Sequence, residues 1–180
     1  MKGKIPTTLC VLIALVLVAF GLIYGTWSGY REDRAQVDEL LTMENGLLDV
    51  LGYRAADGLN LCVVAKRHLP ASDEDLQHLE TAARQMQQSA DVRALTSLDH
   101  AVSDAFAAVS AKLKETVSFQ QSERDQRYLD MLAADLSSLQ SSQIVSAYNR
   151  AAEDYNRQLD QALVGTLAGW LGVEKCPLYE

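Results

Sequence analysis

The residues of this chain that could do chemistry are its three histidines and the carboxylates near them. A carboxylate-bridged metal site in a helical bundle needs two Glu-x-x-His motifs and two further glutamates. Asp75–His78 resembles half of such a site, whereas His68 and His100 have alanine and serine three residues before them. The partner motif is therefore missing. We expect the three histidines to be solvated surface residues, and we expect no metal and no other cofactor.

Serine, cysteine and glycine also lack the arrangements on which catalysis depends. Residues 137–142 contain four serines, but this cluster is typical of a polar helix face, and no Gly-x-Ser-x-Gly turn or Gly-rich phosphate loop occurs. Cys10, Cys62 and Cys176 form no Cys-x-x-Cys pair. A Cys62–Cys176 disulfide stays open for an extracytoplasmic domain. We expect a protein that is not an enzyme and has no small-molecule substrate.

The element that organises the chain is an apolar run at its N-terminus. Ile5–Tyr30 contains no charged side chain over 26 residues. As a helix it would reach roughly 39 Å, which exceeds the ~30 Å core of a bilayer. A helix satisfies its own backbone hydrogen bonds and can therefore cross lipid. The sequence predicts an N-terminal tip and single transmembrane anchor over residues 1–30, followed by one domain over residues 31–180.

A cleaved signal peptide is the alternative interpretation of this run. Both kinds of segment begin with a short basic stretch, here Lys2 and Lys4. Cleavage needs small residues just after the apolar core, whereas this core ends in Tyr24-Gly25-Thr26-Trp27. Trp27 and Tyr30 suit the aromatic belt at a membrane interface. The pattern therefore favours an uncleaved, single-pass anchor.

The charges that flank the anchor hardly fix its orientation. Lys2, Lys4 and the α-amine precede it, and Arg31 and Arg34 follow it, so the positive-inside rule barely separates the two sides. The short tail ahead of a signal-like core favours a cytoplasmic N-terminus and an extracytoplasmic domain.

Three glycines form a stripe on one face of the anchor. Gly21, Gly25 and Gly29 are spaced four residues apart, and such small-xxx-small stripes let two helices approach closely in lipid. The alternative is that glycine is simply common in membrane helices. The stripe predicts that the protein forms a homo-oligomer through its anchor.

The charge balance excludes nucleic acid as a partner. The formal net charge is −8, and Lys2 and Lys4 are the only charged residues among the first thirty, so residues 31–180 carry −10. A domain this acidic repels phosphate backbones, and no basic stripe compensates. Anionic headgroups repel it too, except where apolar surface overrides charge. The lipid bilayer stays the first expected partner, through the anchor.

The rest of the chain has the periodicity of helices. Apolar residues recur at spacings of three and four, and no window shows the alternation of a strand. We expect four helices near residues 31–68, 72–90, 96–117 and 128–162, the second with Ser72 as its N-cap and the first continuous with the anchor or separate from it. Because short connections favour antiparallel neighbours, the predicted class is all-α, with the anchor followed by an antiparallel up-and-down four-helix bundle.

A dipeptide repeats near the end of the last helix. Tyr148-Asn149 and Tyr155-Asn156 are seven residues apart, so the tyrosines share one face and the asparagines an adjacent one. Buried asparagines can fix helix register; two exposed polar residues are the alternative. We favour the register role.

The chain at this point resembles the LemA family of bacterial membrane-anchored proteins. Tyr148–Glu180 is similar to that family's closing segment, in the two Tyr-Asn pairs, Ala168-Gly169, Gly172 and the ending Pro177–Glu180. Arg54 and Asn60-Leu61 match part of a second motif near the first helix. Tyr53 replaces an arginine, Gly58-Leu59 replaces Ile-Pro, and Ala162-Leu163 stands where a proline is usual, so the chain looks like a divergent member.

The resemblance implies a fold and a location but no reaction. It implies one N-terminal anchor in a bacterial inner membrane and an antiparallel four-helix domain, and the molecular function of the family is not established. The family's topology has been predicted with the N-terminus outside, opposite to our orientation. The motif positions, which we assign to packing between the first and last helices, are Arg54, Asn60, Leu61, Tyr148, Asn149, Tyr155 and Asn156.

The functional hypothesis from sequence is a non-enzymatic scaffold or adaptor that presents a helical bundle to other membrane proteins or to itself. The alternative is a self-assembling protein that shapes the bilayer through the glycine stripe and the apolar segment Ala162–Val173. That segment either caps the bundle or rests on the membrane surface.

Overall fold

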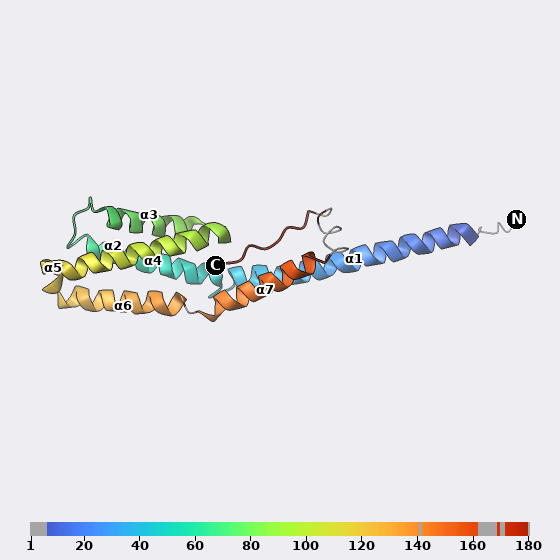
Figure 1. The fold of residues 1–180 in the computed structure, drawn as a ribbon. Coiled ribbons are helices and arrows are strands. Elements are labelled where there is room, and N and C mark those ends of the chain that lie inside the picture. The colour runs from blue at the N-terminus through green and yellow to red at the C-terminus, as the bar shows by residue number, and fades with distance from the viewer. Residues whose placement is uncertain (1–6, 141, 162–168, 170–171, 180) are drawn as a thin grey trace. The chain divides into compact units, whose positions relative to one another are not determined.

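The computed structural model describes residues 7–140, 142–161, 169 and 172–179. It is 81% helix and has no strand within these ranges, which confirms the all-α class. Its elements, shown in Figure 1, are α1 (Thr7–Thr42), α2 (Leu47–Ala65), α3 (Glu74–Gln88), α4 (Val92–Glu115), α5 (Val117–Gln120), α6 (Glu123–Gln140) and α7 (Gln143–Leu159).

The chain divides into two compact units, which we describe separately. The first contains Met1–Asp38 and Ala151–Cys176, and the second contains Glu39–Arg150 and Pro177–Glu180. The first unit includes the apolar run, and it holds most of α1 and the second half of α7. The second includes α2 to α6.

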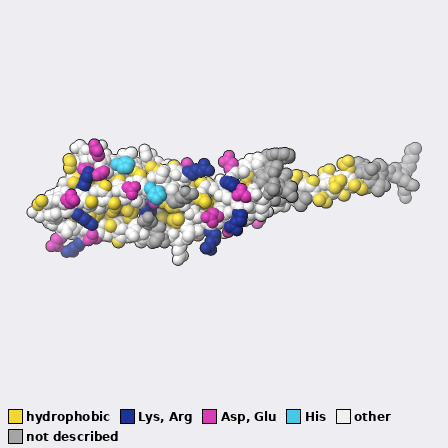
Figure 2. All heavy atoms as spheres, in the orientation of Figure 1, with side chains coloured by type: hydrophobic (Ala, Val, Ile, Leu, Met, Phe, Trp, Pro, Cys, Tyr) yellow, Lys and Arg dark blue, Asp and Glu magenta, His cyan; other side chains and the backbone are white. Residues whose placement is uncertain are grey.

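The first unit begins with the long apolar part of α1. Over the residues that the structure describes, one helical stretch, beginning at Cys10, is long and apolar enough to cross a membrane; its most apolar 18-residue window has a mean hydropathy of 2.3 and is 0% buried. Figure 2 shows hydrophobic side chains along this stretch. Further along α1, Tyr30 and Val37 are buried, and the Tyr30 ring meets that of Tyr155 edge to face, with centroids 6.2 Å apart.

The second unit is built around α2. This helix packs against α3, α4 and α6, and α3 packs against α4; the ribbons lie side by side in Figure 1. Gly58 permits close approach, because a Cβ there would lie 3.3 Å from Leu79 Cδ1 and 3.4 Å from Val102 Cγ1. The core is formed by apolar residues from all four helices, including Leu51, Leu61, Leu76, Leu79, Leu95, Val102, Val109, Leu113, Leu129 and Leu132.

The expected first helix over residues 31–68 is divided in two. Residues 31–42 continue the apolar helix as part of α1, and α2 begins at Leu47. Asn45 has φ of 60°, a left-handed conformation that asparagine tolerates better than most residues. A Cβ on Gly46 would lie 2.7 Å from the Met43 carbonyl oxygen, so this turn requires glycine. Apolar residues with helical spacing lie on both sides of this turn, and the sequence therefore predicted one continuous helix.

The expected fourth helix over residues 128–162 is also divided. α6 ends at Gln140, and α7 begins at Gln143. Ser142 Oγ accepts a hydrogen bond from the Ile144 amide at 3.4 Å, a local contact by which serine competes with the helical ladder. The serine cluster, predicted to be a polar helix face, therefore includes a residue at a helix start.

The two middle helices start at different residues from those expected. Asp73, not Ser72, is the N-cap of α3, because its carboxylate accepts from the Leu76 amide at 3.1 Å. Lys112 pairs with the same carboxylate, and this hydrogen bond lowers the pKa of Asp73. α4 starts at Val92 with Asp91 as N-cap, four residues before the predicted start at Thr96.

Candidate functional site

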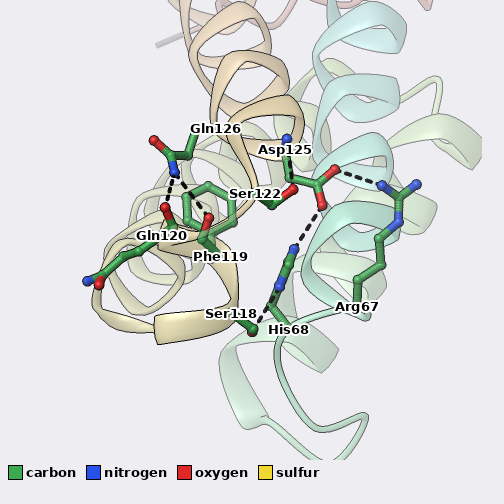
Figure 3. Close-up of polar contacts among 8 residues, drawn as sticks. All are labelled: Arg67, His68, Ser118, Phe119, Gln120, Ser122, Asp125 and Gln126. Carbon is green, nitrogen blue, oxygen red and sulfur yellow. Dashed lines mark hydrogen bonds and ion pairs between the residues drawn. The ribbon is translucent and has the colours of Figure 1, made fainter.

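A serine, a histidine and an aspartate are joined in order at one end of the second unit (Figure 3). Ser118 Oγ lies 3.0 Å from His68 Nδ1, and His68 Nε2 lies 2.9 Å from Asp125 Oδ2. His68 follows the end of α2, Ser118 lies on α5, and Asp125 lies in the first turn of α6. The short helix α5 therefore brings together residues that are 50 positions apart.

The protonation states of this chain of hydrogen bonds depend on Asp125. Its pKa is lowered, first by the hydrogen bond from His68 and further by contacts with Ser122 and Arg67. An ionised carboxylate only accepts, so His68 Nε2 carries a proton. When the ring is neutral, Nδ1 accepts from the Ser118 hydroxyl. This is the order of nucleophile, base and orienting acid that activates serine in many enzymes.

Further contacts around Asp125 hold the neighbouring elements together. Arg67 Nη1 donates to Asp125 Oδ1 at 2.7 Å, so a guanidinium already neutralises the carboxylate that would stabilise a histidinium. The His68 ring stands edge-on to Phe119, with centroids 5.4 Å apart. Gln126 Nε2 donates to the Phe119 and Gln120 carbonyls at the end of α5, and the Phe119 carbonyl also accepts from the Ser122 amide at 2.9 Å. Together these contacts fasten the end of α2 and the turn of α5 to the start of α6.

His68 corrects one prediction from sequence. Its side chain is 8% exposed, so the expectation of a solvated surface histidine is wrong for this residue. His78 and His100 are exposed as expected. Asp75, the other half of the metal motif, pairs with Lys112 at 2.6 Å. Within the described ranges, no group of histidine, cysteine, aspartate and glutamate could hold a metal.

Arg54 forms a second polar cluster, in the core of the same unit. Its Nε donates to Asp99 Oδ1 at 2.5 Å, its Nη1 to the Leu136 carbonyl at 2.7 Å and its Nη2 to Ser103 Oγ at 2.8 Å. Tyr179 Oη donates to the other Asp99 oxygen at 2.5 Å. Burial and this bond raise the pKa of Tyr179. The guanidinium thus joins α2, α4 and α6.

The paired asparagines bind the extended C-terminal segment. In the second unit, Asn149 Nδ2 donates to the Tyr179 carbonyl at 2.6 Å, and its Oδ1 accepts from the Tyr179 amide at 2.9 Å. In the first unit, Asn156 makes the same two bonds to Cys176, both at 2.8 Å. Tyr148 Oη donates to the Pro177 carbonyl at 2.9 Å. The repeat in the sequence thus becomes a repeat of backbone recognition.

Comparison of the chain with protein-family models, with curated proteins and with solved structures found no match. Membership of the LemA family therefore stays a prediction, and a role for the chain must be inferred from the geometry of its own residues.

The other motif residues have different surroundings. Leu61 is buried in the core, whereas Asn60 on the same helix is exposed. Tyr155 contacts Tyr30 across α1 and α7 within the first unit. Arg54 and the two asparagines make their contacts with α4, α6 and the C-terminal segment. The sequence predicts packing between the first and last helices for all the motif positions. Among these contacts, the one between Tyr155 on α7 and Tyr30 on α1 joins two such helices.

The glycine stripe lies on an open face of its helix, and two cysteines are buried. A Cβ on Gly21, Gly25 or Gly29 would meet nothing within 4 Å, so this face of α1 has room for a neighbour. Cys62 and Cys176 are free and buried, and burial raises the pKa of Cys62 to about 11. Most of Ala162–Val173, the predicted cap or membrane-surface segment, lies outside the described residues.

Sequence reasoning missed the two polar clusters for different reasons. Arg54 stands among the apolar positions of α2, between Leu51 and Gly58, and a charge on a core stripe is a signal that it needs a buried partner. The contact of His68 with Ser118 and Asp125 has no such signal in the sequence. It depends on where the fold places the four-residue helix α5.

Proposed function

We propose that this protein is a membrane-anchored, non-enzymatic scaffold or adaptor of the LemA type. In this proposal α1 crosses a bacterial inner membrane once, and α2, α3, α4 and α6 form an antiparallel four-helix bundle outside the cytoplasm. The bundle is presented to other membrane proteins or to a second copy of the chain.

The observation that carries the proposal is the exposed apolar surface of α1. Leu15, Leu17 and Phe20 are each 65% exposed, and Val11, Leu12, Val16, Val18 and Tyr24 are each more than half exposed. Soluble proteins rarely leave a contiguous apolar surface of this kind in water. Because these side chains lie all around the helix, lipid suits them better than a partner that covers a single face.

Alkaline carbonate extraction, together with the intact mass of the recovered protein, tests the anchor. We expect the full-length chain to stay in the membrane pellet with its first thirty residues present. A matched control carries Leu15→Lys and Leu17→Lys, which place two charges in the apolar window and should release the protein. A mature mass that lacks the apolar run would identify a cleaved signal peptide instead.

Photo-crosslinking from the second unit tests the adaptor role. Tyr53 and Val63 on α2 and Met131 on α6 are exposed apolar residues of the second unit, and the crosslinking residue is placed at position 63. Gln87 on α3 is exposed and serves as a matched control position. Recovery of one other membrane protein from position 63 but not 87 supports an adaptor, and recovery of the protein itself supports self-assembly.

A serine-reactive fluorophosphonate tests the non-enzymatic part of the proposal. We expect no labelling of Ser118, because Arg67 shares the carboxylate that would have to support His68 as a base. Labelling that is present in the wild type and lost in His68→Ala would instead identify an activated serine.

The second candidate is a protein that assembles with itself and shapes the bilayer. The open face at Gly21, Gly25 and Gly29 favours it, because close helix pairing in lipid needs such a face. Gly25→Leu should then lower the mass of the detergent-solubilised oligomer. An unchanged mass would remove this candidate's support.

A further inference from the structure

The first unit contains a groove just beyond the apolar run. Its volume is about 470 Å3. It lies along one face of α1, and its opposite wall is formed by α7 and by the chain that leads to Cys176. Aromatic and charged side chains dominate its lining, namely Trp27, Tyr30, Arg31, Arg34, Tyr155 and Glu174.

The groove offers one cation and one anion that are not already paired. Arg34 is occupied, because its Nε donates to Asp38 Oδ1 at 3.0 Å and its Nη1 contacts Cys176 Sγ at 3.1 Å. Among the residues that the structure describes, Arg31 and Glu174 have no hydrogen-bond or ion-pair partner. A ligand with a negative and a positive group would satisfy both.

One aromatic side chain of the lining suits the positive group of such a ligand. Tyr30 and Tyr155 are buried and pack against each other edge to face. Trp27, one turn before Tyr30 and Arg31 on α1, is half-buried and is therefore the ring that a ligand in the groove can reach. Aromatic faces attract ammonium groups, and tryptophan and tyrosine concentrate at the level of lipid headgroups. Glu174 adds a carboxylate that can accept hydrogen bonds from a primary ammonium. A quaternary ammonium has no N–H group and cannot donate such bonds.

The position of the groove matches the depth of headgroups. At ~1.5 Å per residue, Trp27 and Arg31 lie roughly 4.5 and 10 Å beyond Tyr24 along α1. The polar layer on each side of a bilayer core is roughly 5–8 Å thick. If α1 spans the core and leaves it near Tyr24, Trp27 lies within the headgroup layer, and the Arg31 backbone lies roughly 2–5 Å beyond its outer edge. A long arginine side chain can reach back over such a distance to a phosphate.

We propose that this groove binds the head of a zwitterionic phospholipid of the phosphoethanolamine class, with Arg31 on the phosphate and Glu174 on the ammonium. The proposal rests on the membrane anchor of the proposed function. Guanidinium groups bind phosphate through paired N–H donors. A head without net charge also agrees with the charge of −10 on residues 31–180, which repels anionic lipid surfaces.

Native mass spectrometry of the full-length, detergent-solubilised protein tests this site. Phosphatidylethanolamine, phosphatidylcholine and phosphatidylglycerol are added separately at equal concentrations. We expect the ethanolamine lipid to be retained most, and Arg31→Ala to weaken its retention about tenfold, the effect of one lost charge-assisted contact. Glu174→Gln should remove the preference for ethanolamine over choline and leave phosphate binding in place.

The matched controls are Arg93→Ala and Glu115→Gln, at exposed positions of the second unit, and both should retain lipid as the wild type does. Equal retention by wild type and Arg31→Ala overturns the site, as does a preference for phosphatidylglycerol. Soluble glycerophosphoethanolamine is tested too; if it binds as tightly as the lipid, the site is for a free solute and the lipid assignment fails.

Failure of the site and failure of the anchor are distinguishable. Release of the wild-type protein by carbonate contradicts the anchor. A protein that stays in the membrane pellet, but whose lipid retention is unchanged by Arg31→Ala, keeps the anchor and loses the headgroup site.

Discussion

Two arginine–aspartate pairs in the second unit differ in how far water reaches them. The side chains of Arg54 and Asp99 are 1% and 8% exposed, whereas those of Arg67 and Asp125 are 47% and 8% exposed. The bonded atoms are at similar distances, 2.5 and 2.7 Å. The two pairs therefore differ in the exposure of the arginine to water and hardly in the distance between the bonded atoms.

The contrast indicates which pair specifies the fold. Water cannot replace a missing partner of Arg54, so Asp99, Ser103 and the Leu136 carbonyl must all be in place, and Tyr179 must satisfy the second Asp99 oxygen. An arrangement of α2, α4 and α6 that lacks one of these contacts would leave a buried charge or polar atom unpaired. Arg67 can turn to solvent, so its pair strengthens the junction at α5 without determining it.

The largest expected effect comes from breaking the buried pair. Asp99→Ala leaves the Arg54 guanidinium uncompensated in the core and should lower the free energy of unfolding by about 3–5 kcal/mol. Chemical unfolding of the full-length protein in detergent, followed by circular dichroism, measures it. Asp104→Ala, at an exposed position of the same helix, is the control and should stay within about 0.5 kcal/mol of wild type.

The double variant Arg54→Met with Asp99→Leu sharpens this result. An apolar replacement of a whole buried ion pair often restores stability, so most of the loss should be recovered. A double variant as unstable as Asp99→Ala would show that the pair is needed for more than charge compensation.

An intermediate effect, dependent on pH, is expected at Asp125. Its pKa is lowered in the folded protein, chiefly by His68, so its contribution is present above the unfolded-state value of about 3.9 and is lost as the pH falls through the folded-state value. Asp125→Asn should cost about 1–2 kcal/mol at neutral pH and flatten the decline of stability below about pH 4.

The control for this prediction is Asp130→Asn, on the exposed face of α6. The quantity to compare is the slope of unfolding free energy against pH between wild type and variants. Equal slopes for wild type and Asp125→Asn would mean that Asp125 gains nothing from His68 in the folded state.

Local patterns were enough to predict which segments are helical. They could not predict contacts between residues that are distant in the sequence. The apolar run of α1 and the stripes of α3 and α4 follow from period alone. The breaks at Asn45 and Ser142 were not predicted, because one turn of irregular backbone hardly disturbs the spacing of apolar residues. Gly46 lies at the first break, where a Cβ has no room, but a glycine in a sequence indicates only a locally weaker helix and not a required turn.

The candidate sites show the same difference between what local patterns reveal and what depends on distant residues. The Tyr-Asn repeat was visible, and its regularity predicted one repeated role, but the partner is an extended chain segment and not another helix. A side-chain amide can pair with a peptide group as another peptide would, which helix periodicity does not reveal. The groove beside Arg31 joins this residue to Tyr155 and Glu174, which lie far along the chain and which only the fold brings near.

The smallest effect is expected at Arg67. Arg67→Ala removes a half-exposed ion pair and should change the free energy of unfolding by about 1 kcal/mol or less. This small difference should shrink further in ~1 M salt, where the Debye length is about 3 Å, while the effect of Asp99→Ala should persist because the pair is shielded from ions. Unfolding at low and high salt measures both. If Arg67→Ala were as destabilising and as insensitive to salt as Asp99→Ala, exposure would not be what separates the two pairs, and the junction at α5 would have to be counted among the contacts that specify the fold.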